Sequence, residues 1–365
     1  MNITFLIGNG FDRNLGLNTT YSEFVQDYKK IKPKTDILKK FHTYINENEE
    51  LWSSAEIAIG KYTKELEAGA AVAFAECYTD FCEKLAQYLK EQMQHIDYDD
   101  SQEKILNAFS NLNKIIQSFP TQERDALNTL YKNRGGEQIT FNFICYNYTD
   151  TLDQCISVIK NEPNVLGSHK YGNQVLNHLI GQICHVHGTV DNEMVFGVND
   201  ESQISKLDVF DCEDGDLYKN MLIKIQANAS FLENTDANAS QLIKNSQLIY
   251  IYGMSIGETD KLWWDRICTW LSGSGERHLI VQKYDMPVKT VIQLPYQLAE
   301  RRARRNITKY SSLDDNKKNN IESRIHITGE NIFGDIKNIA KEPGNKKHLT
   351  IFEQGASEKK ELVIV

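Results

Sequence analysis

Residues 3–24, ITFLIGNGFDRNLGLNTTYSEF, are the stretch that decides the fold. Residues 3–7 are apolar or β-branched, which predicts a buried strand. The turn Gly8-Asn9-Gly10-Phe11 follows it, and Asp12 stands where a helix is expected to begin. A strand, a glycine turn and a helix start present backbone N–H groups and a positive dipole end to an anion. The stretch therefore predicts that the backbone of Gly8 to Phe11 holds a nucleotide phosphate.

The glycine spacing departs from the dinucleotide fingerprint G-x-G-x-x-G, because the next glycine after Gly10 is Gly16. A tight turn without a ligand is the alternative interpretation. Asp12 also has two interpretations. A carboxylate at a helix start repels a phosphate placed against it, so Asp12 either caps the helix or binds a ribose hydroxyl.

The composition is that of a globular protein, with 365 residues, 41% of them hydrophobic and 25% charged. No run approaches the ~20 apolar residues of a membrane span. The pattern of a signal peptide is not expected, because Asn9, Asp12 and Arg13 interrupt the N-terminal apolar stretch early. We therefore expect a cytoplasmic protein that makes no membrane contact. The net charge of −9 argues against a general nucleic-acid-binding surface.

The seven cysteines are scattered and form no C-x-x-C pair, which predicts reduced side chains, without a disulfide framework or a structural zinc site.

Strands alternate with helices along most of the chain, which predicts an α/β fold with a Rossmann-like, mostly parallel sheet. A large all-α insertion of four or five helices is expected after the first strand–helix unit. The predicted domains are a nucleotide-binding core of residues 1–34 and 134–340, an insertion of residues 35–133 and a loose tail of residues 341–365. Strands are expected at 3–7, 139–146, 182–187, 194–196, 247–252, 278–283 and 324–328, and helices at 76–95, 101–119, 216–229, 238–245, 260–271 and 295–305.

Four of the predicted strands end in polar or glycine-bearing segments. Because ligands bind at the carboxyl ends of parallel strands, these segments are expected to form one site. The segments are GNGFD at 8–12, NYTD at 147–150, HVHG at 185–188 and YGMSIGETD at 252–260.

In the second segment we expect Asn147 to contact the ligand, because it precedes the helix cap. Thr149 and Asp150 either cap the following helix or take part in catalysis.

In the third segment His185 and His187 lie on the same side of a strand, because they are two residues apart. A metal pair with Asp191 as third ligand is one alternative for them, and we expect no metal. His187 stands directly before Gly188 at the strand end, where a neutral imidazole can act as a general base.

In the fourth segment Gly253 and Ser255 suit a close approach to phosphate or ribose. Asp260 either contacts the ligand or caps the next helix. Farther along, the arginine run at 301–305 is a solvated helix face or, alternatively, a phosphate or nucleic-acid contact.

These blocks resemble the AbiH family of bacterial abortive-infection, anti-phage proteins. The resemblance rests on IGNGFDRNLGLNTTYSEF, FNFICYNYTDTLD, HVHG with VFGVND after it, and YIYGMSIGETD, which occur in this order over nearly the whole chain.

The same blocks are distantly similar to the sirtuin NAD-binding fold. The sirtuin glycine pattern falls on Gly8, Gly10 and Gly16, its Asn and Asp on Asn147 and either Thr149 or Asp150, its His-Gly on His187-Gly188, and its Gly-Thr-Ser on 253–255. The resemblance implies that His187 is the general base, that Asn147 contacts the ribose beside nicotinamide, and that Gly8, Gly10 and Ser255 line the phosphates and the adenosine ribose. The paired C-x-x-C zinc module of sirtuins is absent from this sequence, which argues against deacylation.

The resemblance implies an NAD-consuming hydrolase that cleaves the nicotinamide–ribose bond, with NAD as substrate and catalytic residues His187, Asn147 and Asp150. The alternatives are an enzyme acting on another nucleotide substrate and a non-enzymatic nucleotide sensor or protein-interaction module with a degenerate core. Expected partners are NAD or a related nucleotide, a phage-derived trigger or a defence partner protein, and further copies of the chain.

Overall fold

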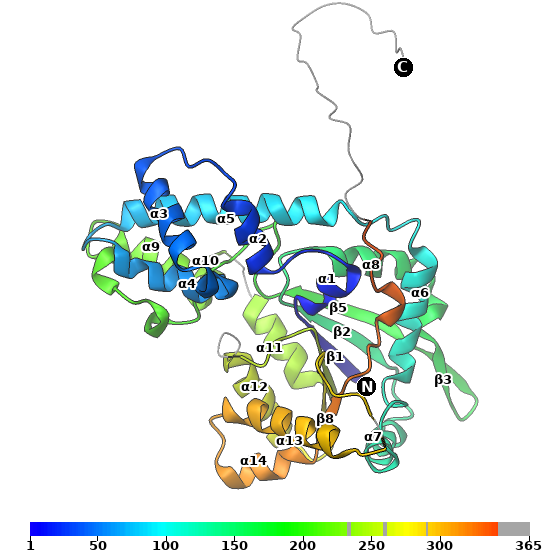
Figure 1. Cartoon of the computed structure of the whole chain (residues 1–365). Helices are drawn as coiled ribbons and strands as arrows, with labels where there is room; N and C mark the ends of the chain where they lie inside the picture. The colour runs from blue at the N-terminus through cyan, green and yellow to red at the C-terminus, as the bar shows by residue number, and fades with distance from the viewer. Residues whose placement is uncertain (232–234, 258–260, 290, 342–365) are drawn as a thin grey trace, which may run out of the picture.

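A six-stranded parallel sheet forms the centre of the computed structural model, which describes residues 1–231, 235–257, 261–289 and 291–341 (Figure 1). The strands lie in the order β5-β2-β1-β6-β7-β8. Their bounds are β1 Asn2–Ile7, β2 Thr140–Cys145, β5 Leu179–His185, β6 Leu248–Tyr252, β7 His278–Gln282 and β8 Ile325–Thr328. Numbered along the chain, this is the order 3-2-1-4-5-6 of a doubly wound Rossmann-like sheet, which confirms the predicted fold class.

The central strand β1 is buried on both faces, as its apolar sequence predicts. Phe5 lies opposite Phe143 of β2 and Tyr250 of β6, and its ring stacks on both of these rings at centroid distances of 5.4 and 5.2 Å. The order of strands reverses between β1 and β6. Ligands of doubly wound sheets bind at such a switch point, outside the carboxyl ends of the strands.

Helices cover both faces of the sheet (Figure 1). The first face is covered by α1 (Gly10–Leu15), α6 (Gln102–Ser110), α7 (Thr121–Asn133) and α8 (Thr151–Lys160). The second is covered by α11 (Thr235–Asn245), α12 (Lys261–Ser272), α13 (Leu294–Lys309) and α14 (Asp315–Glu322).

A separate helical body stands beside the sheet with its own aromatic core (Figure 1). It contains α2 (Tyr21–Tyr28), α3 (Asp36–Glu47), α4 (Ala55–Tyr62), α5 (Ala71–Met93) and α9 (Gly215–Leu222). The all-α region after the first strand–helix unit is therefore present. Its helices divide between two cores, because α6 and α7 pack on the sheet and α9 joins the helical body. The domain boundaries at residues 34 and 133 stay a prediction.

The structure corrects the prediction of a continuous helix over residues 216–229. Val198 N–H donates to Leu222 O at 2.9 Å, and Lys224 N–H donates to Val198 O at 2.8 Å. This backbone bridge holds Ile223 in an extended conformation, so α9 ends at Leu222 and α10 (Lys224–Phe231) starts after it. The predicted pattern of apolar residues spans the break and does not reveal it.

Two further predictions of local structure were wrong, and one element was missed. Residues 194–196 form no strand, since the chain bends back there toward His187, whose carbonyl accepts from Val195 N–H at 2.8 Å. The predicted helix at 101–119 ends at Ser110 and continues as a short 3₁₀ turn. The hairpin of β3 (Ser168–Tyr171) and β4 (Gln174–Asn177) was not predicted. The predicted loose tail lies outside the described residues apart from Lys341.

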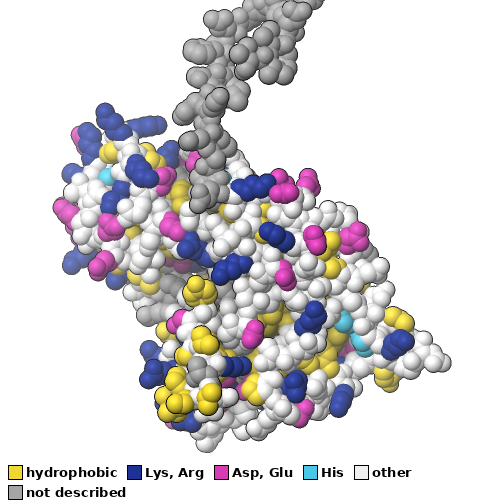
Figure 2. Space-filling view, turned by 45° about the vertical axis from the view of Figure 1, so that its right-hand side comes forward, with side chains coloured by type: hydrophobic (Ala, Val, Ile, Leu, Met, Phe, Trp, Pro, Cys, Tyr) yellow, Lys and Arg dark blue, Asp and Glu magenta, His cyan; other side chains and the backbone are white. Residues whose placement is uncertain are grey.

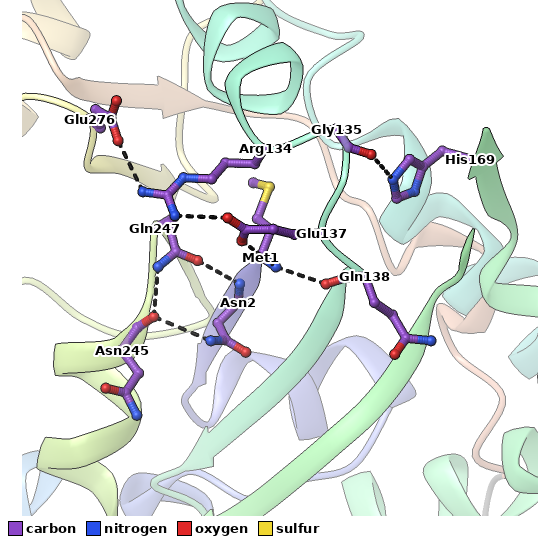
Figure 3. Close-up of polar contacts among 10 residues, drawn as sticks. All are labelled: Met1, Asn2, Arg134, Gly135, Glu137, Gln138, His169, Asn245, Gln247 and Glu276. Atoms are coloured by element: carbon purple, nitrogen blue, oxygen red, sulfur yellow. Dashed lines mark hydrogen bonds and ion pairs between the residues drawn. The ribbon is translucent and has the colours of Figure 1, made fainter. Parts of the chain in front are cut away.

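Polar contacts join the starts of the strands at the amino-terminal edge of the sheet (Figure 3). The Met1 ammonium lies 2.9 Å from the Glu137 carboxylate, and Asn2 N–H donates to the side chain of Gln247 at 2.7 Å. Arg134 pairs with Glu276 at 3.0 Å. These contacts align β1 with β2 and β6 at the edge opposite to the carboxyl ends.

None of the helices in the described part of the chain has the length and apolar character needed to cross a bilayer.

Candidate functional site

A cavity of about 260 Å³ lies at the carboxyl edge of the sheet, at the switch point between β1 and β6. All four polar segments expected from the sequence contribute to its lining. From the strand ends come Gly8, Asn9, Asp12, Asn147, Tyr148, Thr149, His187, Gly253, Met254 and Ser255. The helical body adds Tyr21, Glu56, Leu85 and Leu89, and α10 adds Lys224. The cavity therefore lies between the sheet and the helical body.

The glycine turn after β1 is bonded to the loop after β6. Gly8 N–H donates to Tyr252 O at 2.9 Å, Gly10 N–H to Gly253 O at 2.8 Å, and Phe11 N–H to Gly8 O at 2.9 Å. These three donors are already satisfied, which corrects the expectation of a backbone phosphate cradle over Gly8 to Phe11. Gly10 and Phe11 do not line the cavity, and the Phe11 ring packs edge-on against Tyr252.

We expect Gly10→Ala to destabilise the protein by at least about 2 kcal/mol, because a Cβ on Gly10 would lie 2.3 Å from Gly253 Cα. Backbone cannot move aside as a flexible side chain can. The control is Gly275→Ala, where a Cβ meets nothing within 4 Å, and its effect should stay within about 0.5 kcal/mol. Urea unfolding of both variants measures the difference. Equal stability of the two variants would contradict the close packing of these loops.

Asp12 is a buried carboxylate in the cavity wall. It accepts hydrogen bonds from Thr149 Oγ1 at 2.7 Å and from Thr151 Oγ1 at 2.6 Å. Burial raises the pKa of Asp12 to about 6, against the opposing effect of the two hydroxyl groups. Asn9 precedes the first residue of α1, so the interpretation of Asp12 as the helix cap was wrong. Its carboxylate is available to a ligand.

Asn147 carries buried polar atoms without partners. Its amide lies near enough to Asp12 to oppose the rise in the pKa of that carboxyl. Yet neither amide atom makes a hydrogen bond of normal geometry within the described part of the chain. Because an unsatisfied buried amide is costly, this side chain is one that a bound ligand would satisfy.

The structure separates Asp150 from the cavity. Asp150 directly precedes α8 and accepts from Gln154 Nε2 at 2.7 Å. Thr149 lines the cavity and bonds Asp12. Asp150 is therefore absent from the cavity lining, although its charge is near enough to contribute to the raised pKa of Asp12, and its catalytic role stays a prediction. The buried carboxylate nearest the segment is Asp12.

His187 is a buried imidazole whose Nδ1 has no hydrogen-bond partner among the described residues. Burial and the positive charge of Lys224 hold the pKa of His187 well below its usual value, so the ring is neutral at physiological pH. The rings of Tyr146 and Tyr148 lie 5.9 and 6.4 Å away. Gly188 is outside the lining and has a positive φ of 66°, which lets the chain turn directly after His187.

Two residues of the metal alternative, His185 and Asp191, have other partners. His185 Nε2 lies 2.7 Å from Asp153, and Asp191 pairs with Lys90 at 2.6 Å. Within the described ranges, no three His, Cys, Asp or Glu side chains gather as a metal site.

Glu56 and Lys224 form an ion pair in the cavity wall that was not predicted. Their charged atoms are 2.6 Å apart, and the side chains are 14% and 6% exposed. Glu56 also accepts from Tyr21 at 2.8 Å and from Tyr148 at 3.2 Å. Lys224 stands between two isoleucines, one of which is exposed, so this pattern does not reveal its burial. Nothing in the sequence links it to Glu56.

All four polar segments lie within the part of the chain that matches a known family. A family model described as "Bacteriophage abortive infection AbiH" matches residues 4–281. The chain belongs to the AbiH family. This membership gives it a role in abortive infection, the defence of bacteria against phages. A search of the curated proteins finds no match.

The AbiH match includes every residue that lines the cavity. Ser255 lines the cavity and is exposed, and its contact with a ligand stays a prediction. Asp260, the last residue predicted for this site, lies outside the described residues.

In this AbiH protein we expect Glu56→Gln to destabilise the fold by about 3 kcal/mol, because the Lys224 ammonium then remains buried without a counter-charge. Adding Lys224→Met should recover most of the loss, since the buried charge is removed. Glu50→Gln, at an exposed position before α4, is the control. Denaturant unfolding of the wild type, the two single variants, the double variant and the control measures the coupling. Additive losses in the double variant would contradict a buried ion pair.

Proposed function

We propose that this AbiH protein is an NAD-consuming hydrolase that cleaves the nicotinamide–ribose bond. The observation that carries the proposal is the meeting of three groups in one cavity. They are the neutral imidazole of His187, the unsatisfied amide of Asn147 and the buried carboxylate of Asp12. The cavity lies where doubly wound sheets bind nucleotides.

These groups suit the chemistry of a glycosidic bond. When the bond between ribose C1′ and the nicotinamide nitrogen breaks, its electron pair leaves with nicotinamide, and positive charge develops on the ribose. The ionised carboxylate of Asp12 stabilises that charge. His187 accepts a proton from the water that forms the new C1′–O bond. Asn147 bonds the ribose hydroxyl groups. The products are nicotinamide, ADP-ribose and a proton.

The size of the cavity suggests which part of NAD it holds. About 260 Å³ is slightly below the roughly 300–1,000 Å³ of typical small-molecule sites. This favours enclosure of the nicotinamide riboside portion, with the pyrophosphate and adenosine extending past Ser255.

The experiment incubates purified full-length protein with NAD and follows nicotinamide and ADP-ribose by chromatography. Stoichiometric release of both supports the proposal. In parallel, thermal unfolding is measured with and without NAD, because a ligand that binds the folded state raises the unfolding temperature. A raised temperature without turnover would favour the nucleotide-sensor alternative. The absence of both NAD turnover and thermal protection by NAD would refute the assignment of NAD to this cavity.

A further inference from the structure

The loop after β7 and the exposed face of α13 form a surface that the proposed function does not use. We call it the α13 surface. Its apolar members are Tyr284, Val288, Val291, Ile292, Leu294 and Leu298, and its basic members are Lys289, Arg301, Arg302, Arg305 and Lys309. Val291, Tyr284 and Val288 are 102%, 92% and 83% exposed. Thr290 lies outside the described residues and is not part of this surface.

Figure 2 shows hydrophobic side chains gathered at the lower left of the molecule, with Lys and Arg side chains beside them. This is the part of the molecule in which α13 lies in Figure 1. Apolar side chains that project fully into water are unfavourable unless a partner covers them, and contiguous groups of them mark interaction sites.

Helical spacing continues this surface along α13. Leu294, Leu298, Arg302, Arg305 and Lys309 follow one another at intervals of three or four residues and are all exposed. The opposite face, which includes Ala303 and Ile307, is buried against the sheet. The outer face of α13 is therefore apolar at its start and basic toward its end.

The local charge is opposite to that of the whole protein. Residues 283–309 contain seven basic and two acidic side chains, in a chain with a net charge of −9. Of the two acidic residues, Asp285 pairs with Lys283, and Glu300 is half-buried. Arg304 turns inward and donates to Ile325 O at 2.8 Å. The remaining exposed charges of α13 are positive.

We propose that the α13 surface docks the protein on an anionic membrane. Acidic lipid headgroups complement the basic face, and the adjoining hydrocarbon accepts the projecting apolar side chains. A second copy of the same surface would place arginines against arginines. A nucleic acid would match the charges but leave the apolar side chains in water. Binding at a membrane surface needs no spanning segment. The proposal therefore departs from the expectation of no membrane contact, which was drawn from the absence of such a segment.

The test is sedimentation of the full chain with vesicles of phosphatidylcholine alone or mixed with phosphatidylglycerol. We expect binding to the anionic vesicles at least about tenfold stronger than to the neutral ones, and weaker in high salt, because each basic residue near the surface adds attraction that salt screens.

Two variants separate the parts of the surface. The triple change Arg301→Glu, Arg302→Glu, Arg305→Glu should abolish the preference for anionic vesicles, and Val291→Ser with Ile292→Ser should weaken binding at least about fivefold. The matched controls are Lys40→Glu, Lys61→Glu, Lys64→Glu on exposed positions of the helical body, and Val72→Ser with Val175→Ser, which are 69% and 58% exposed. Circular dichroism and thermal unfolding establish that each variant is folded.

Absence of vesicle binding by the wild-type chain overturns the proposal. Equal loss of binding in the α13 and control variants also overturns it. Salt-sensitive binding to duplex DNA that needs the arginines but not Val291 and Ile292, without vesicle binding, would identify nucleic acid as the occupant. None of these outcomes depends on NAD turnover, because the surface is built from residues outside the cavity.

Discussion

Replacing His187 by glutamine is expected to lower the rate of NAD hydrolysis at least about a hundredfold, the usual contribution of a positioned general base. Glutamine keeps a polar side chain in the buried position but cannot accept a proton near neutral pH. In the proposed reaction His187 acts by proton transfer, since its ring is buried and neutral and its Nδ1 has no hydrogen-bond partner among the described residues.

Initial rates of nicotinamide release at saturating NAD measure this effect. His95→Gln is the control, since His95 is a partly exposed histidine at the end of α5, away from the cavity. A rate within about threefold of the wild type for His187→Gln would remove the general base from the mechanism. Thermal unfolding of the variant establishes that it is folded, so that a lower rate is not caused by unfolding.

Replacing Asp12 by asparagine is expected to slow hydrolysis at least about a hundredfold at pH 8, because the amide cannot neutralise charge on the ribose. In the wild type the rate should fall as the pH drops through about 6, where the buried carboxyl takes up a proton. The slow residual rate of Asp12→Asn should lack this midpoint. A midpoint near 6 that survives in Asp12→Asn would assign the titration to another group.

The same substitution should raise stability at high pH. The pKa of Asp12 is higher in the folded protein than its ordinary value of 3.8. Because the pKa is raised on folding, protonation of Asp12 contributes to the free energy of unfolding. This contribution is fully present below about pH 4 and is lost as the pH rises through about 6. The rise from 3.8 to about 6 corresponds to about 3 kcal/mol.

Asp12→Asn should therefore be more stable than the wild type by about 1–3 kcal/mol at pH 8, and the advantage should shrink toward pH 4. Urea unfolding at the two pH values measures it. The control is Asp125→Asn on an exposed position of α7. A lower stability of Asp12→Asn than of the wild type at pH 8 would contradict a free-energy cost of burying the ionised carboxylate.

The sheet and the loops at its carboxyl edge were predictable because they depend on local pattern. β1, β2 and β6 are apolar on both faces, and a buried parallel strand has that signature in any context. Since parallel strands end at one edge, the polar residues after them had to lie near one another. This placed Asn147 and His187 together without any knowledge of contacts.

The choice between carboxylates depended on packing that no local pattern contains. Asp12 and Asp150 both follow a strand within a few residues. Only the folded chain brings the hydroxyl groups of Thr149 and Thr151 to Asp12 and bonds Asp150 to Gln154. The pairing of Glu56 with Lys224 joins residues far apart in the sequence and depends on the break between α9 and α10.

The bonds between the glycine turn and the loop after β6 tie together one wall of the cavity, its floor, and the helical body supplies another wall, its roof. Gly8 and Gly10 are tied to Tyr252 and Gly253, so the two loops of the floor cannot spread apart without breaking the sheet register. The roof belongs to a body with its own aromatic core, and the hydrogen bond between Tyr148 and Glu56 is one of its contacts with the strand ends. Entry of the proposed ligand would therefore require movement of the helical side of the cavity, and the contacts that Glu56 makes with Lys224 and Tyr148 oppose that movement.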